Sequence, residues 1–121
     1  GSPLPHVELD DVDGNRIPMM SLVQPGHFLL IAGEDGADWC DAAKELAGAS
    51  GIPLDAVRIG HATGDYRDPR CMWLRRREIS RRGAVLVRPD RYVAWRSIEA
   101  VEDPLGALRG ALAKVLARAA A

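Results

Sequence analysis

The sequence is poor in cysteine, and this scarcity limits the chemistry that the chain can carry. Its 121 residues include only Cys40 and Cys71, which are far apart and form no CxxC motif. We therefore expect no zinc site. One disulfide between them is an alternative, but two reduced, partly buried thiols of a cytoplasmic protein are the simpler interpretation.

An excess of charge of one sign is also absent, and so are long apolar runs. The formal net charge is −1, which gives no general attraction to nucleic acid or to an anionic membrane. No stretch approaches the roughly 18 apolar residues of a membrane span, and we find no signal-peptide pattern. The composition thus predicts a cytoplasmic protein with neither nucleic acid nor membrane among its partners.

Familiar ligand and catalytic motifs are missing as well. The histidines, His6, His27 and His61, are scattered without ligand spacing, so no metal site is expected. The sequence has no GxGxxG fingerprint, no P-loop and no nucleophile elbow. Asp65 and Asp68 are candidates for a carboxylate pair, but acids near a helix start are more often caps. The residues therefore predict no complete catalytic site and no cofactor-binding residue.

The chain does contain enough apolar sequence for one packed domain. Hydrophobic residues make up 47% of its 13.1 kDa, and this size is typical of a single domain. Residues 1–2, Gly-Ser, resemble a cloning scar. We expect one domain over residues 3–121, excised from a longer protein.

The segment from Gly83 to Ser97 forms the centre of the predicted fold. Residues 84–87, Ala-Val-Leu-Val, are apolar without interruption, which is typical of a strand covered on both faces. Residues 88–91, Arg-Pro-Asp-Arg, predict a tight turn. Tyr92 to Arg96 then predict a second, antiparallel strand.

Hydrophobic periodicity places the remaining elements around this hairpin. Further strands are expected over 6–9, 28–32 and 56–60, and helices after the N-cap residues Asp38, Asp68 and Asp103. The first helix should end at Gly48 or Gly51, and the two strands beside it should be parallel. The order β-α-β, α, β-β-α predicts an α/β, thioredoxin-like fold. Its central mixed sheet, a βαβ unit plus an antiparallel hairpin, would be flanked by helices on both faces.

Cys40 is the residue for which this fold suggests chemistry. It lies in the first turn of the helix after a central strand, where thioredoxin-like proteins carry a reactive cysteine and where a helix N-terminus lowers a thiol pKa. A single-cysteine thiol oxidoreductase is therefore one hypothesis. Against it, Ala43 stands where a resolving cysteine would lie, and Asp38 and Asp41 disfavour a thiolate. Residues 83–84, Gly-Ala, also replace the cis-proline of a thioredoxin, so we favour a packed structural thiol.

The strongest local charge is a run of arginines at positions 75, 76, 77, 81 and 82. Binding of phosphate, nucleic acid or an acidic surface is one interpretation. No aromatic residues are interleaved with it as a base-stacking platform requires. We favour a solvated helix face, with contact to another domain of the same chain as the better functional alternative.

The hairpin sequence resembles that of a known enzyme family. Residues 83–90, Gly-Ala-Val-Leu-Val-Arg-Pro-Asp, and 93–96, Val-Ala-Trp-Arg, are similar to the end of the class A flavoprotein aromatic hydroxylases. This group includes phenol and chlorophenol monooxygenases and polyketide hydroxylases. Weaker matches cover most of the chain: Pro5-His6, Asp13-Gly14, residues 26–30, Trp39 with Ala42-Ala43, and Asp65 before Trp73.

The resemblance implies a C-terminal, thioredoxin-like domain without the redox cysteine pair. It implies FAD and NAD(P)H as cofactors of a parent monooxygenase and no cofactor in this fragment. The partners would be the FAD and substrate domains of the parent and, in some relatives, a second copy. Relatives usually have glycine at the position of Arg91, so Arg91 should have either a positive φ or a changed turn.

Overall fold

The computed structural model describes residues 8–11, 13–60, 65–67, 83–97 and 102–120. Several predicted features lie outside these residues. They are His6 and His61, the helix after Asp68 with Cys71, and the arginines between positions 75 and 82.

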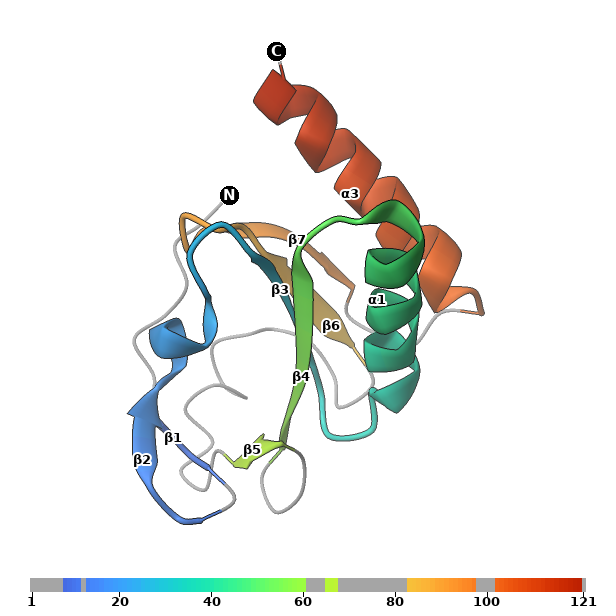
Figure 1. Cartoon of the computed structure of the whole chain (residues 1–121). Helices are drawn as coiled ribbons and strands as arrows, with labels where there is room; N and C mark the ends of the chain where they lie inside the picture. Colours follow the sequence, from blue (N-terminus) through green and yellow to red (C-terminus); the bar gives the residue numbers. More distant parts are fainter. Residues whose placement is uncertain (1–7, 12, 61–64, 68–82, 98–101, 121) are drawn as a thin grey trace.

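A mixed seven-stranded sheet forms the centre of the fold (Figure 1). Its strands are β1 (Glu8–Asp10), β2 (Arg16–Pro18), β3 (Phe28–Ala32), β4 (Leu54–Gly60), β5 (Tyr66–Arg67), β6 (Ala84–Val87) and β7 (Val93–Ser97). Their order across the sheet is β2-β1-β5-β4-β3-β6-β7. β3 and β4 are parallel, whereas β6 is antiparallel to both β3 and β7. The predicted βαβ unit and hairpin are confirmed.

Uninterrupted apolar sequence explains the middle of the sheet. Every residue of β3 and β6 is buried, because both faces of these strands are covered. Phe28 at the start of β3 pairs with Leu54 at the start of β4. Leu29 pairs with Val87 at the end of β6. The register therefore brings the starts of β3 and β4 and the turn after β6 to one end of the sheet.

The short N-terminal strands differ from the sequence prediction. Residues 8–9 of the strand expected over 6–9 belong to β1, which lies between β2 and β5, and β2 forms the edge. β5 and the 3-10 helix η1 (Met19–Leu22) were not predicted. Strands of two or three residues are too short to show a period-two pattern, so periodicity does not detect them.

Two long helices are described, α1 (Ala37–Ser50) and α3 (Pro104–Ala120). The prediction that Asp38 caps α1 is wrong, because Gly36 is the N-cap and no side chain caps this end. The C-terminal prediction is confirmed at Gly51, whose φ of 74° suits a residue without a Cβ. α3 begins as predicted, and the Asp103 carboxylate accepts a hydrogen bond of 3.1 Å from the Gly106 N–H.

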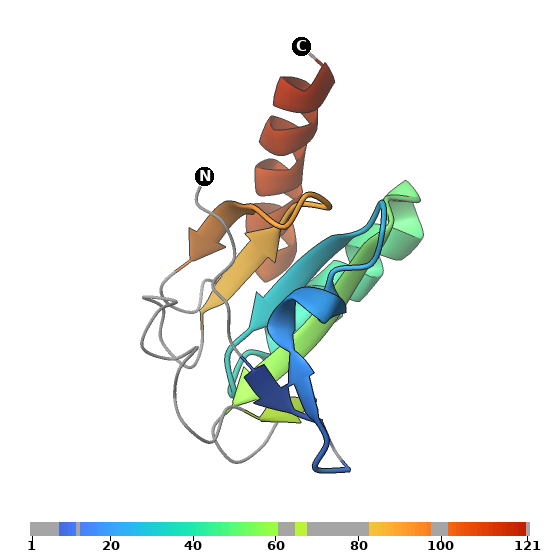
Figure 2. The ribbon, with the colours of Figure 1, turned by 90° about the vertical axis from the view of Figure 1, so that its left-hand side faces the viewer.

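Two apolar cores lie on opposite faces of the sheet. The first is formed by α1, α3 and one face of β3 and β6, and it includes Trp39, Leu46, Leu108 and Leu112. The second joins the other face to β1 and η1. Figures 1 and 2 show both described helices on the same side of the sheet, with η1 on the opposite side. The helix expected for that opposite side, after Asp68, lies outside the described residues.

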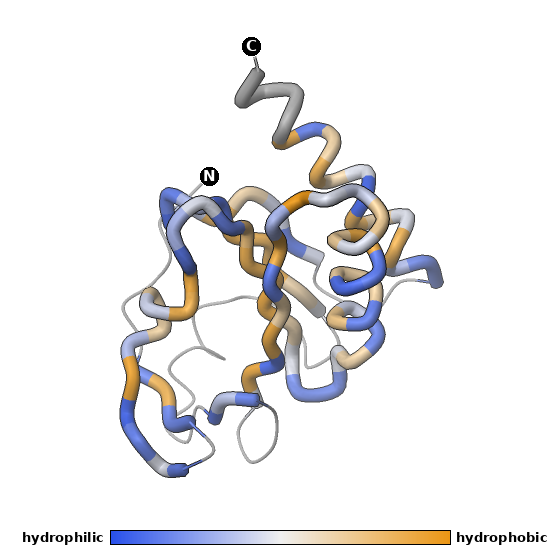
Figure 3. Tube along the Cα trace, in the orientation of Figure 1, coloured by the Kyte–Doolittle hydropathy of each residue, from blue (hydrophilic) through white to orange (hydrophobic). Residues whose placement is uncertain are grey.

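Hydropathy follows the same arrangement. In Figure 3 the hydrophobic residues are concentrated along the central strands, whereas the connecting turns are hydrophilic. The predicted α/β fold with a mixed central sheet is therefore confirmed.

Candidate functional site

The candidate residues lie at two opposite ends of the sheet. At the end where β3 and β4 finish and α1 begins, Cys40 is the residue of interest; we call this the helix-start end. At the other end lie His27 before β3, Asp55 in β4 and the turn 88–92 between β6 and β7. We call this second surface the hairpin end, and it is at the top of the sheet in Figure 1.

The helix-start end is closed by a tight loop, Gly33 to Gly36. The Gly33 N–H donates to the Gly83 carbonyl at 3.0 Å, and the Gly36 N–H donates to the Gly33 carbonyl at 3.0 Å. A Cβ added to Gly36 would lie 2.8 Å from the Cβ of Ala32. This distance is well below ordinary carbon contact. α1 therefore begins directly against β3, and the closeness of the two explains why glycine, rather than Asp38, starts the helix.

Cys40 lies in the first turn of α1 and faces the core. Its side chain is 7% exposed, beside Trp39, which is 1% exposed. Burial raises the pKa of the Cys40 thiol to about 11, and Asp65 and Asp41 act in the same direction against Arg58 and Lys44. Burial thus outweighs any help from the helix N-terminus. The neutral thiol, and not the nucleophilic thiolate, is the stable form at neutral pH.

Asp65 is bound to the backbone of β4. Its carboxylate accepts a 2.9 Å hydrogen bond from the Arg58 N–H, and its own N–H donates to the Arg58 carbonyl at 3.0 Å. The Arg58 guanidinium in turn donates to the Glu34 carbonyl at 3.1 Å. Asp65 therefore connects the start of β5 to β4. This contact depends on how the chain returns to β4, so a local sequence pattern does not predict it.

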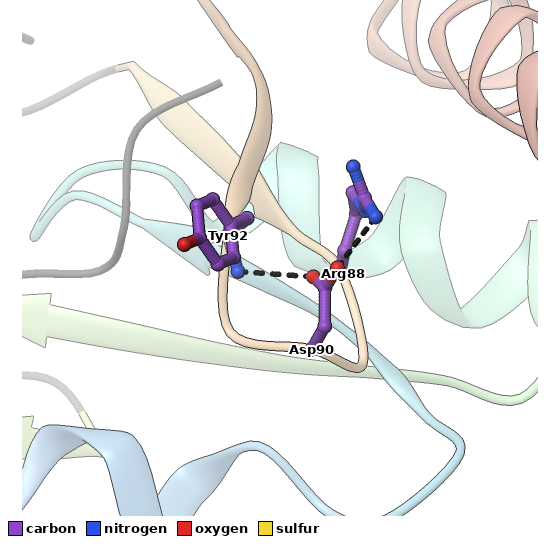
Figure 4. A network of polar contacts seen from close by, with 3 residues as sticks. All are labelled: Arg88, Asp90 and Tyr92. Carbon is purple, nitrogen blue, oxygen red and sulfur yellow. Dashed lines mark hydrogen bonds and ion pairs between the residues drawn. The ribbon is translucent and has the colours of Figure 1, made fainter.

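The turn at the hairpin end is held by its own polar groups (Figure 4). The Arg88 N–H donates to the Tyr92 carbonyl at 2.8 Å, and the Arg91 N–H donates to the Arg88 carbonyl at 2.9 Å. The Asp90 carboxylate pairs with the Arg88 guanidinium and accepts a 3.2 Å hydrogen bond from the Tyr92 N–H. A register shift at Leu86/Val87 precedes the turn. These contacts fix the direction in which the turn leaves the sheet.

Arg91 has a φ of 69°, and it is the one non-glycine residue with a positive φ in the described part of the chain. The first of the two expectations for Arg91 is thereby confirmed. A side chain in this left-handed region costs roughly 1 kcal/mol relative to glycine. The surrounding hydrogen bonds hold the conformation despite that cost.

His27 and Asp55 form a pair that the sequence did not reveal. Their Nδ1 and Oδ2 atoms lie 3.2 Å apart, and the two side chains are 37% and 36% exposed. Both facing atoms are shielded from solvent, and neither has a hydrogen-bond partner within the described residues. The two atoms are close enough for an ion pair when the imidazole is protonated, but the contact does not have hydrogen-bond geometry. Parallel pairing of β3 and β4 places Asp55 opposite Leu29, two residues after His27, so the two side chains are diagonal neighbours.

The predicted site residues are thus only partly brought together. Cys40 and Asp65 share the helix-start end, while His27 lies at the hairpin end. Among the residues that the structure describes, no three His, Cys, Asp or Glu side chains gather as metal ligands do. No helix in that part of the chain combines the length and the apolar character of a membrane span.

Comparison with known proteins identifies the domain. The family model described as "Aromatic-ring hydroxylase, C-terminal" matches residues 1–119. Tetracenomycin B2 monooxygenase-dioxygenase of Streptomyces olivaceus is 42% identical over 118 residues, which are 98% of this chain and 21% of that protein. 2,4-Dichlorophenol 6-monooxygenase of Delftia acidovorans is 38% identical over 116 residues, 96% of this chain and 20% of that protein. The chain therefore spans about a fifth of the length of these relatives.

Solved structures agree with this assignment. The ternary complex of aklavinone-11 hydroxylase with FAD and aklavinone matches with a TM-score of 0.83 and 38% identity, over 93% of this chain and 20% of that one. The thioredoxin domain of a thiol-disulfide oxidoreductase from Bacteroides vulgatus matches with a TM-score of 0.60 and 12% identity, over 91% of this chain and 95% of that one. The second likeness shows the thioredoxin-like fold alone. The chain belongs to the family of aromatic-ring hydroxylase C-terminal domains.

Proposed function

We propose that the chain is the non-catalytic C-terminal accessory domain of an aromatic-ring monooxygenase that uses FAD and NAD(P)H. The observation that carries the proposal is the pattern of coverage. The relatives match 98% of this chain but only 21% of their own length. A segment of that size with its own cores is one domain of a larger enzyme.

The helix-start end does not fit FAD. In many α/β proteins a dinucleotide pyrophosphate binds at the N-terminus of the helix after the first central strand, against a glycine-rich turn. The corresponding turn here carries the carboxylates of Glu34 and Asp35, with Asp38 in the first turn of α1. Nor is there room beside Gly36. We therefore assign no cofactor and no reaction step to this domain, and FAD belongs to the parent.

Thiol chemistry is no better supported at this end. A reactive thiol needs an accessible sulfur and a lowered pKa, whereas Cys40 is 7% exposed and burial raises its pKa to about 11. We propose that Cys40 packs as a small apolar residue beside Trp39 and Ala43.

The domain's role is then contact with other parts of the enzyme. We propose that it packs on the FAD domain of the parent or supports oligomerisation, in a cytoplasmic protein. The relatives are named for reactions of tetracenomycin B2 and of 2,4-dichlorophenol. We propose an aromatic substrate for the parent, bound by residues outside this chain.

The test is to produce the full parent polypeptide and to measure bound flavin and NAD(P)H oxidation. Stoichiometric FAD is expected, with oxidation that depends on an aromatic compound and yields a hydroxylated product. A parent polypeptide without flavin, or with oxidation that no aromatic compound stimulates, would show the proposal to be wrong.

A further inference from the structure

The hairpin end presents an exposed aromatic ring beside an exposed cation. Tyr92 is 45% exposed, and no other large hydrophobic side chain in the described part of the chain is exposed. The neighbouring Arg91 side chain is also exposed, and no ion pair or hydrogen bond of its guanidinium occurs among the described contacts. Tyrosine and arginine are the residue types that most often anchor protein interfaces.

The surface around these two residues also includes the segments that lead into β3 and β4. Pro25 precedes β3 and Pro53 precedes β4, and both are exposed. The Phe28 N–H donates to the Pro53 carbonyl at 2.9 Å, so these segments begin side by side. Since Leu29 pairs with Val87, the hairpin turn lies next to them at the same end of the sheet (Figure 1).

The turn at this end of the sheet is held by several polar contacts of its own. Asp90 holds both Arg88 and the backbone of Tyr92 (Figure 4), and the turn closes with hydrogen bonds of 2.8 and 2.9 Å. The positive φ of Arg91 is kept although a glycine would adopt it with less strain. Strained residues that persist are concentrated at functional sites, and a preformed surface loses less conformational entropy when it binds.

We propose that the hairpin end, with Tyr92 and Arg91 as its anchors, docks onto the preceding part of the parent polypeptide. The inference rests on the proposed function and gives the accessory domain its contact surface. The receiving surface holds an apolar depression for the Tyr92 ring. It also holds a carboxylate or backbone carbonyl groups that accept hydrogen bonds from the Arg91 guanidinium.

The size of the surface favours a partner in the same chain over a second copy. A stable interface between separate proteins buries roughly 1,200–2,000 Å², which one exposed aromatic ring on a turn does not approach. Covalent connection raises the effective concentration of the partner to about the millimolar range. Interfaces between domains of one chain are accordingly smaller and more polar. About four fifths of each relative lies outside the matched segment, so such a partner is available.

The first experiment is hydroxyl-radical footprinting of Tyr92 in the full parent polypeptide and in the 121-residue chain. Docking predicts at least fivefold slower oxidation of Tyr92 in the parent, while the half-buried Tyr66 of β5 serves as the internal control. Equal rates in the two proteins would overturn the proposal. Slower oxidation in the 121-residue chain as its concentration rises would also overturn it, because that result identifies a second copy as the partner.

The second experiment uses Arg91→Gly. This substitution should raise the thermal stability of the domain but weaken its docking. In the 121-residue chain the variant should unfold at a temperature about 3 °C higher, because strain is relieved. In the parent it should increase the oxidation of Tyr92 at least twofold. Arg109→Ala, at an exposed position of α3, is the matched control and should change neither. Unchanged Tyr92 protection in the Arg91→Gly parent would contradict the role of Arg91.

These outcomes are separable from failure of the proposed function. One result is a parent that holds FAD and hydroxylates an aromatic compound while Tyr92 is oxidised as fast as in the 121-residue chain. That result would contradict only the docking surface. A parent without flavin contradicts the proposed function, whatever the footprint of Tyr92.

Discussion

The Cys40 thiol should react unusually slowly with alkylating reagents. The reduction in its rate, relative to a free thiol, follows from its raised pKa and its burial. The measurement uses a Cys71→Ser variant, which leaves Cys40 as the only thiol, and iodoacetamide over pH 7 to 11. Burial raises the Cys40 pKa from 9.0 to about 11. A shift of two units lowers the thiolate fraction near pH 8 about a hundredfold, and only the thiolate reacts. Cys40 is 7% exposed, and this limited access slows the reaction further.

The control is the same variant unfolded in guanidinium chloride, where the thiol is free. The folded protein should react at least one hundred times more slowly at pH 8. A folded-state rate within tenfold of the unfolded one, or an apparent pKa below 9, would show that burial does not suppress the reactivity of Cys40. Either result would also revive the thiol oxidoreductase hypothesis for Cys40.

The same shift predicts how stability depends on pH. Because the folded pKa lies above the unfolded one, the folded state binds more protons between about pH 9 and pH 11. The stabilisation from the neutral thiol is therefore complete below pH 9 and is lost as the pH rises toward 11. Two units correspond to about 3 kcal/mol. Cys40→Ala should lack this part of the decline, and parallel curves for the two proteins would contradict it.

Three further substitutions test the packing and polar contacts. Asp103→Ala removes the N-cap hydrogen bond of α3 and should cost about 1 kcal/mol in urea unfolding; no change would mean that this cap contributes nothing. Trp39→Ala removes a buried side chain, of a residue that is 1% exposed. Its ring packs edge-on against the ring of Trp95, with 5.5 Å between the ring centroids. It should cost about 3–5 kcal/mol, and a loss below 1 kcal/mol would show that the core re-forms around the gap. In a double-mutant cycle, His27→Ala and Asp55→Ala should be coupled by about 0.5 kcal/mol, as for a partly exposed ion pair, because their Nδ1 and Oδ2 atoms lie 3.2 Å apart; strictly additive effects would show that the two side chains do not interact.

The parts of the fold that were predicted correctly depend on local sequence. β3 and β6 are apolar along their whole length, and this pattern alone indicates strands that are covered on both faces. The residues of the hairpin turn predict its position, whereas the positive φ of Arg91 was one of two alternatives that followed from the glycine of the relatives at that position. The end of α1 at Gly51 is also predicted by local sequence. Only a residue without a Cβ adopts the left-handed conformation of this position without strain.

The missed features depend on contacts between distant residues. Asp38 has the side chain of a good N-cap, but close packing of Gly36 against Ala32 starts α1 earlier. The pairing of His27 with Asp55 requires the register of two parallel strands, which hydrophobic periodicity does not specify. β5 exists only because residues 66–67 pair with both β4 and β1.

Titration of the isolated 121-residue chain with FAD, followed by flavin fluorescence, tests the central claim most directly. The parent polypeptide is measured under the same conditions. The parent is expected to contain FAD, and the isolated chain is expected to show no saturable binding up to about 100 µM. Saturable, micromolar binding of FAD by the isolated chain would contradict the claim that this is an accessory domain without a cofactor site.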